Sequence, residues 1–157
     1  MIEFLDKETG VFKRDLFNFW FEWEIRRGIR YQNFISFILL EPDRGITNIK
    51  SLCDLVKVMK KNIRDTDIIG RLNYQKFGII LLMSDLDEAY IMASRLMEHV
   101  NNYIFEKEPS NSIELSIGGS CFPTNGIEKK VLIEKAELML IEAKKSKHNK
   151  IVFSATI

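Results

Sequence analysis

The residues that could do chemistry gather in one stretch of the chain, Arg64 to Phe77. Two short β-rich runs separated by a few polar residues predict a β-hairpin here. A hairpin tip is a natural place for chemistry, but the tip residues, 73–76, include neither a carboxylate nor a glycine. The charged pair of this stretch lies upstream instead, as Arg64 and Asp67. We therefore expect function to depend on this pair rather than on the tip.

Length and composition indicate one globular domain. The chain has 157 residues, of which 46% are hydrophobic and 29% are charged, which is enough for a proper core. A net charge of +1 gives no global field that would attract nucleic acid or a membrane surface. No apolar run is long enough to span a membrane, and the first ten residues lack the features of a signal peptide. We expect a cytoplasmic protein, or a cytoplasmic piece of a longer one.

The cysteines and histidines do not form a metal-binding pattern. Cys53 and Cys121 each lie in an apolar pattern, which favours reduced core thiols. His99 and His148 are far apart and have no Cys or His at ligand spacing. We therefore expect neither a metal site nor a cofactor.

An aromatic helix is predicted from about Lys13 to about Arg30. Two of its aromatic residues, Phe17 and Phe21, fall off the main apolar face. A helix with two apolar faces usually has two partners. Either both faces are buried within the domain, or Phe17 and Phe21 are exposed and bind a second subunit or a protein partner. The main face contains the following residues: Phe12, Leu16, Phe19, Trp20 and Trp23.

Periodicity predicts a strand, a helix and the hairpin after this first helix, and then a second helix. The apolar run 34–40 predicts a strand covered on both faces and ended by Pro42. Helical spacing predicts a helix over 49–63, and Asp85 with Glu88 is typical of a helix cap. The helix that Asp85 begins is expected to bury one row of side chains: Leu86, Ala89, Tyr90, Ala93, Leu96, Val100 and Ile104.

The remaining pattern completes the fold. A strand is predicted at 113–117, a helix over 132–143 and a short strand at 151–153. The order is a helix, then β-α-β-β-α-β, then a C-terminal α-β extension. This order predicts an α+β fold, an α/β sandwich whose ferredoxin-like antiparallel sheet is backed by helices.

Several short motifs stand in a definite order along the chain. The opening, Asp6 to Arg14, is similar to a DxLTGLxNR turn, and Ser116-Ile117-Gly118 matches an SIG strand. The stretch from Ala136 to Asn149 matches the closing pattern AD…AK..GRN of a known domain family. Residues 71–77 occupy the position of that family's signature, R-Y-G-G-D-E-F. In this order the motifs resemble the GGDEF domain, the family of diguanylate cyclases that make cyclic di-GMP. The resemblance implies a single domain over residues 1–157 with a nucleotidyl-cyclase-like sheet.

The resemblance also shows where the chain departs from the family. Glu41 stands where the family has its first metal-binding aspartate, and Gln75 is a poor ligand for a hard cation. The family's guanine-holding segment has no counterpart, because the loop between Asp43 and Ile49 is too short. These departures imply a degenerate, catalytically inactive domain that is not an enzyme. The positions of the degenerate active site are Glu41, Asn73, Tyr74, Gln75, Lys76, Lys144 and His148. Of these, Lys144 still matches a phosphate-contacting lysine of the family, and His148 replaces an arginine.

The resemblance implies a ligand site at the charged pair. Many members of the family carry an inhibitory product site, RxxD, five residues before the signature, and Arg64 and Asp67 match it. A guanidinium can bind phosphate or a guanine edge in bidentate fashion, and a carboxylate can accept from the other guanine edge. Arg95 stands at the position of a second arginine. The implied function is binding of cyclic di-GMP at these three residues, relayed to a protein partner.

Two alternatives remain open for the sequence. Arg64 and Asp67 also fit an ordinary helix end, where arginine favours the dipole and aspartate caps a turn. The domain could then be a ligand-free dimerisation or docking module that uses Phe17 and Phe21.

Overall fold

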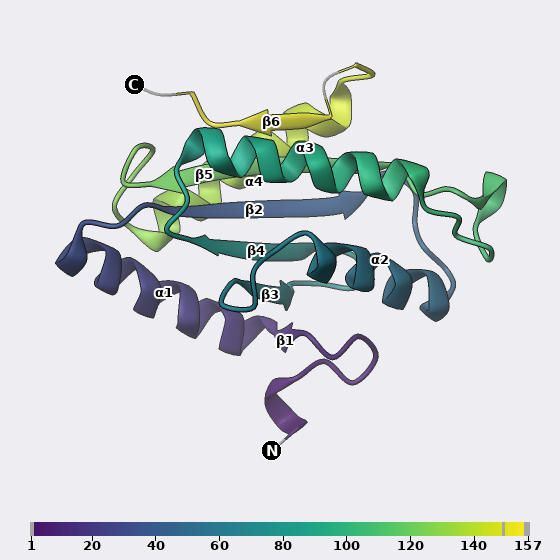
Figure 1. Cartoon of the computed structure of the whole chain (residues 1–157), viewed down its shortest axis with the longest axis horizontal. Helices are drawn as coiled ribbons and strands as arrows, with labels where there is room; N and C mark the ends of the chain where they lie inside the picture. The colour runs from purple at the N-terminus through teal and green to yellow at the C-terminus, as the bar shows by residue number, and fades with distance from the viewer. Residues whose placement is uncertain (1, 149, 156–157) are drawn as a thin grey trace.

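The computed structural model describes residues 2–148 and 150–155. Its strands form one mixed sheet in the order β1-β3-β4-β2-β5-β6 (Figure 1). The four inner strands pair antiparallel, while β1 and β6 add to the two edges in parallel. This confirms the predicted α+β fold with a ferredoxin-like core. The strands are β1 (Phe12–Lys13), β2 (Ile35–Pro42), β3 (Ile68–Arg71), β4 (Phe77–Leu82), β5 (Leu115–Phe122) and β6 (Ile151–Phe153).

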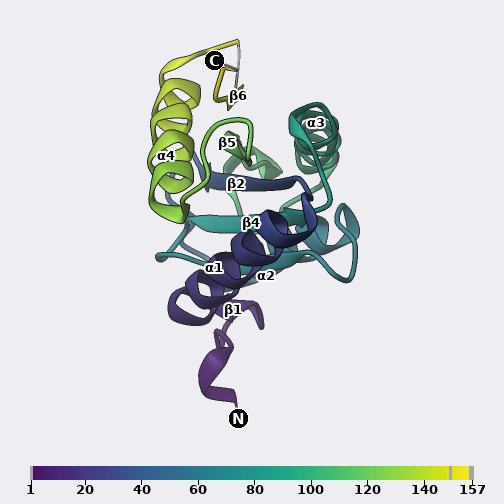
Figure 2. The same cartoon turned by 90° about the vertical axis from the view of Figure 1, so that its left-hand side faces the viewer.

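Helices cover both faces of the sheet (Figure 2). One face packs against α1 (Arg14–Tyr31) and α4 (Lys129–Lys145), and the other against α2 (Ile49–Lys61) and α3 (Leu86–Asn102). Successive residues of β2 alternate between the two cores, since Phe37 belongs to the first and Ile38 to the second. Two short 3₁₀ helices complete the described elements: η1 (Ile2–Phe4) precedes β1, and η2 (Pro109–Asn111) lies between α3 and β5.

The cap predicted for α3 is confirmed. Asp85 Oδ1 accepts a hydrogen bond of 2.9 Å from the Glu88 N–H, and Glu88 Oε1 accepts one of 3.2 Å from the Asp85 N–H. This reciprocal capping box satisfies two N–H groups that the helix itself leaves unpaired. It fixes the start of α3 directly after the hairpin. The row of side chains that α3 buries is shorter than predicted, because Tyr90 is exposed, and Ile104 lies beyond the helix and is exposed.

β2 ends at Pro42, as the sequence predicted, but the missing N–H of the proline is not what ends it. Pro42 pairs with Leu115 on β5, and the next residue continues the ladder, since the Asp43 N–H donates to the Glu114 carbonyl at 2.8 Å. The pairing of β2 with β4 already stops at Leu40. The missing N–H of the proline therefore falls on the side of the strand that has no neighbour, where it costs no ladder hydrogen bond.

Helix α1 buries the face that the sequence analysis assigned to a protein partner. Phe17 and Phe21 are fully buried and pack against Phe37, with ring centroids 6.1 Å and 4.7 Å away. The prediction that Phe17 and Phe21 bind a partner is therefore wrong. The buried row continues through Ile25 to Gly28, where an added Cβ would lie 2.8 Å from the Phe122 ring. The glycine lets this face of α1 approach the sheet closely, and the other aromatic residues are turned outward.

The two thiols differ in burial. Cys121 is fully buried, and burial raises the pKa of its thiol, so it stays protonated. Cys53 is half-buried, and its thiol donates to the Glu8 carbonyl at 3.0 Å. In the part of the chain that the structure describes, no helix has the length and apolar character needed to cross a bilayer.

Candidate functional site

Strand pairing places the predicted site residues at opposite ends of the sheet. In the β2–β4 pair, Leu40 faces Phe77 at one end and Ile35 faces Leu82 at the other. The hairpin tip and Glu41 therefore lie at the first end, which we call the hairpin end. Arg64 and Asp67 precede β3 and lie at the second end, which we call the arginine end.

The hairpin tip is a closed turn. Asn73 Oδ1 accepts hydrogen bonds from the N–H groups of Gln75 at 3.1 Å and Lys76 at 2.8 Å. The Leu72 N–H donates to the Lys76 carbonyl at 2.8 Å. A side chain that occupies the turn in this way keeps the backbone of the tip in one conformation without a glycine.

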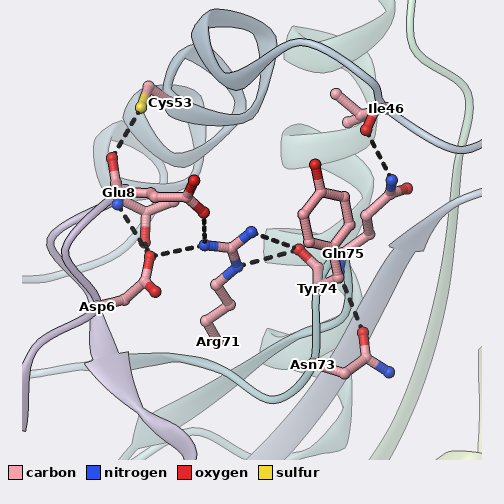
Figure 3. A network of polar contacts seen from close by, with 9 residues as sticks. Asp6, Glu8, Ile46, Cys53, Arg71, Asn73, Tyr74 and Gln75 are labelled. Atoms are coloured by element: carbon pink, nitrogen blue, oxygen red, sulfur yellow. Dashed lines mark hydrogen bonds and ion pairs between the residues drawn. The ribbon is translucent and has the colours of Figure 1, made fainter.

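A buried arginine ties this tip to the start of the chain (Figure 3). Arg71 Nη1 lies 2.9 Å from Asp6 Oδ2 and 2.7 Å from Glu8 Oε1, and its side chain is only 7% exposed. Its Nε and Nη2 donate to the Tyr74 carbonyl at 3.0 Å and 2.8 Å, and the Tyr74 ring lies over the guanidinium. All three nitrogens of this guanidinium therefore have partners within the chain itself.

The network shifts the pKa values of its members. Burial alone would raise the pKa of Asp6, but hydrogen bonds from the Thr9 hydroxyl and the Arg71 guanidinium outweigh burial and hold the pKa below its usual value. Burial also opposes the charge of Arg71, yet its hydrogen bonds with Glu8 and Asp6 outweigh burial and raise its pKa above the usual value. Arg71 is thus a cation and Asp6 an anion at any physiological pH.

Two side chains of the tip are bound to neighbouring segments. Gln75 Nε2 donates to the Ile46 carbonyl at 2.8 Å, which fastens the tip to the loop after β2. Lys76 Nζ lies 3.0 Å from Glu137 Oε2 on α4. The tip is consequently held between the β2–α2 loop and helix α4.

The end of β2 carries two further ion pairs. Glu41 Oε1 lies 2.7 Å from Lys144 Nζ, and Asp43 Oδ2 lies 2.9 Å from Lys150 Nζ. His148 is exposed, and with Lys144 and Lys150 it lines a hollow of about 630 Å³. Asn149, which the resemblance places in the closing pattern, lies outside the described residues.

The hairpin end does not fit a divalent cation as the side chains stand. The Glu41 carboxylate is bound to Lys144, and Gln75 turns its amide nitrogen toward Ile46. Within residues 2–148 and 150–155, no three His, Cys, Asp or Glu side chains come together as metal ligands. The residues at this end are bound instead to one another.

The arginine end is built around one buried carboxylate. The Asp67 side chain is 2% exposed, and its Oδ2 accepts from the Arg64 N–H at 2.9 Å and lies 3.5 Å from Arg64 Nε. Its Oδ1 accepts from the Leu82 N–H at 3.0 Å, and Arg64 Nη2 donates to the Leu82 carbonyl. The Arg64 side chain remains 58% exposed. Asp67 thus holds the loop in place, and Arg64 presents its charge at the surface.

Arg95 is bound by Asn62, which stands two positions before Arg64 in the chain. Its Nε donates to Asn62 Oδ1 at 3.2 Å, and its Nη2 donates to the Asn62 carbonyl at 2.7 Å, just after α2 ends. The structure therefore places all three predicted ligand-binding residues at the same end of the sheet. Arg64 lines two hollows of about 340 and 260 Å³, and Arg95 lines neither of them.

Sequence reasoning missed several partners of these residues. Glu8 and Asp6 bind Arg71 from more than sixty positions away, and Asn62 binds Arg95 from 33 positions away. Spacing along a helix or strand carries no signal for such contacts. The position of Asp6 in the DxLTG-like turn is the one signal that could have pointed to a role for it.

The fold is similar to that of several solved structures. The GGDEF domain of DgcB from Caulobacter crescentus, in complex with c-di-GMP, superposes with a TM-score of 0.84 at 14% identity, covering 96% of this chain and 95% of that chain. The active GGEEF domain of a diguanylate cyclase from Vibrio cholerae gives a TM-score of 0.83 at 20% identity, covering 92% and 98%. At these identities the likeness shows the fold alone.

The sequence comparisons identify the family. A family model described as "Diguanylate cyclase, GGDEF domain" matches residues 50–150, more than half of the chain. The probable diguanylate cyclase DgcT of Escherichia coli K12 is 27% identical over 101 residues, which are 62% of this chain and 22% of DgcT. The chain thus spans about a fifth of the length of that curated relative. 

These findings also correct the expectation that the chain is not an enzyme. Both the family and DgcT are described as diguanylate cyclases. The expectation is therefore wrong. The chain belongs to the GGDEF domain family of diguanylate cyclases.

Proposed function

We propose that this GGDEF signalling domain binds cyclic di-GMP at the arginine end of the sheet and relays the bound state to a protein partner. The observation that carries the proposal is the state of Arg64. Its guanidinium is exposed while its backbone N–H and Nη2 are held by Asp67 and Leu82. A cation fixed in this way loses little conformational entropy when it binds a phosphate.

Arg95 adds a second positive charge at the same end. Its partners are the amide and carbonyl oxygens of Asn62, which orient the guanidinium without neutralising it. Cyclic di-GMP carries two phosphates and two guanines, so it needs more than one such donor. The DgcB domain, whose fold is the same, is described in complex with c-di-GMP.

In this geometry Asp67 acts mainly as a positioning residue. Its carboxylate is buried and already accepts from two backbone N–H groups and from Arg64. Arg64 supplies the direct contact to the phosphate. Binding then shifts the population of the loop and its neighbours toward the ligand-bound arrangement, which a partner protein can recognise.

The proposal is tested by calorimetric titration of the purified chain with cyclic di-GMP. Arg64→Ala removes charge-assisted hydrogen bonds and should weaken binding about tenfold or more. Arg44→Ala is the matched control, because Arg44 is also exposed but follows β2 at the hairpin end. Absence of binding by the folded chain, or equal losses in both variants, would refute the proposed site.

A further inference from the structure

The outward face of α1 has no role in the proposed ligand site. Phe19 is 59% exposed and Trp23 is 48% exposed, one turn apart on the helix. The half-buried Trp20 places its ring edge-on to Phe19, with centroids 5.7 Å apart. Both cartoon views show α1 on the outside of the molecule (Figures 1 and 2). Exposed aromatic side chains that form one patch are typical of an interaction surface.

The charges on this face change sign along the helix. Asp15 and Glu22 lie in its N-terminal part, and Arg26 and Arg30 lie in its C-terminal part. At 100° per residue, these four positions share the outward side with Phe19. A helix face with this charge order is complementary to the same face running in the opposite direction.

We propose that this face binds the same face of a second copy of the chain, with the two helices antiparallel. A two-fold axis between Glu22 and Trp23 places Asp15 opposite the partner's Arg30 and Phe19 opposite the partner's Arg26. Each contact then occurs twice, as an isologous interface requires. Arginine over an aromatic ring adds a cation–π contact to each ion pair. A parallel arrangement is unfavourable because it sets Arg26 against Arg26 and Asp15 against Asp15.

The size of the surface sets the strength of this dimer. A helix of 18 residues is about 27 Å long. A strip of that length and about 10 Å in width has roughly 270 Å², well below the roughly 800 Å² per partner of a standard interface. We therefore expect a reversible dimer whose population depends on concentration, with Trp23 and Phe19 as its anchors. The dimer uses a different set of residues from the ligand site, so either proposal can fail alone.

Charge exchange tests the antiparallel arrangement in the full chain. Asp15→Lys and Arg30→Glu should each weaken the dimer about tenfold, because each sets like charges against each other at two symmetric places. The double variant Asp15→Lys/Arg30→Glu should restore the dimer, since opposite charges face each other again. Sedimentation equilibrium over micromolar to submillimolar concentrations measures these constants, and circular dichroism checks that each variant is folded.

A second test of the dimer removes one of its aromatic side chains. Trp23→Ala should weaken the dimer about thirtyfold or more. Ile91→Ala, which removes an exposed apolar side chain from α3 on the other face of the sheet, should leave it unchanged. A chain that stays monomeric throughout the concentration range would overturn the proposal. So would a dimer that ignores Trp23→Ala, or a double charge variant that remains as weak as the single ones.

Discussion

At the hairpin end of the sheet, Arg71, Lys76 and Lys144 each form an ion pair with a carboxylate of the same chain. At the arginine end, Arg95 is bound by an amide. Arg64 lies 3.5 Å from the Asp67 carboxylate, which also accepts from two backbone N–H groups, and its side chain is 58% exposed. A carboxylate cancels the charge that an incoming phosphate would meet, whereas an amide only orients the cation. An anion site is therefore located by the partners of the basic residues, and not by the number of basic residues.

The largest expected effect follows from removing the most enclosed cation. Arg71→Ala leaves Asp6 and Glu8 without their partner and the Tyr74 carbonyl without its donor, so we expect a loss of about 3 kcal/mol in the free energy of unfolding. Urea denaturation measures it, and Lys57→Ala on the exposed side of α2 is the control. A loss no larger than that of the control would mean that the buried network contributes little to stability.

The arginine end should respond to loss of its buried carboxylate. Asp67→Ala removes the acceptor of the Arg64 and Leu82 N–H groups and should cost about 2 kcal/mol of unfolding free energy. Asp67→Asn keeps one acceptor oxygen and should cost less. Cyclic di-GMP affinity should fall less in Asp67→Asn than in Arg64→Ala. The reverse order would show that the Asp67 carboxylate contacts the ligand directly.

Acid should weaken the hairpin end through Asp6. The pKa of Asp6 is lower in the folded chain than the usual 3.8, so its ion pair stabilises the fold above that value. This contribution is lost as the pH falls below 3.8 and through the lower folded pKa. Asp6→Asn should therefore flatten the slope of unfolding free energy against pH over this range. Urea titrations on both sides of pH 3.8 compare the slopes, and unchanged slopes would contradict the assignment.

The smallest effect is expected from Glu41. Its ion pair with Lys144 is partly exposed, so Glu41→Ala should change stability by about 1 kcal/mol or less. The affinity of this variant for cyclic di-GMP should stay within about twofold of that of the unchanged chain, since Glu41 lies at the far end of the sheet from Arg64. The same calorimetric titration measures this. A loss comparable to that of Arg64→Ala would place the ligand at the hairpin end instead.

Much of the fold could be predicted because local periodicity and capping determine it. The Asp85 cap, the hairpin and the strand order each depend on residues close together in the sequence or on simple pairing rules. The buried face of helix α1 could not be predicted, because aromatic residues lie on two faces and give no clear amphipathic direction. Glycines on both sides of the contact allow it: Gly70 and Gly78 of the sheet leave room for the Phe17 ring, and Gly28 lets the end of the helix approach Phe122.

The candidate site was less predictable than the fold. The residues of the arginine end could be named from a short motif, but their roles depend on partners such as Leu82 and Asn62 that only folding brings near. The enzyme expectation was wrong for a different reason. It weighed single positions, namely the signature residues 73–76, Glu41 and His148, and the short loop after Asp43, whereas the family match extends over residues 50–150.

One residue at the end of β4, Leu82, can report on the arginine end. The N–H of Leu82 donates to Asp67, and its carbonyl accepts from Arg64, so both sides of this residue are fastened to the same loop. Exchange of the Leu82 amide proton with deuterium therefore requires the loop to release it. A ligand that pulls Arg64 away would speed this exchange, and one that locks the loop would slow it. The exchange rate of this single amide proton thus reports the motion of the loop without any added label.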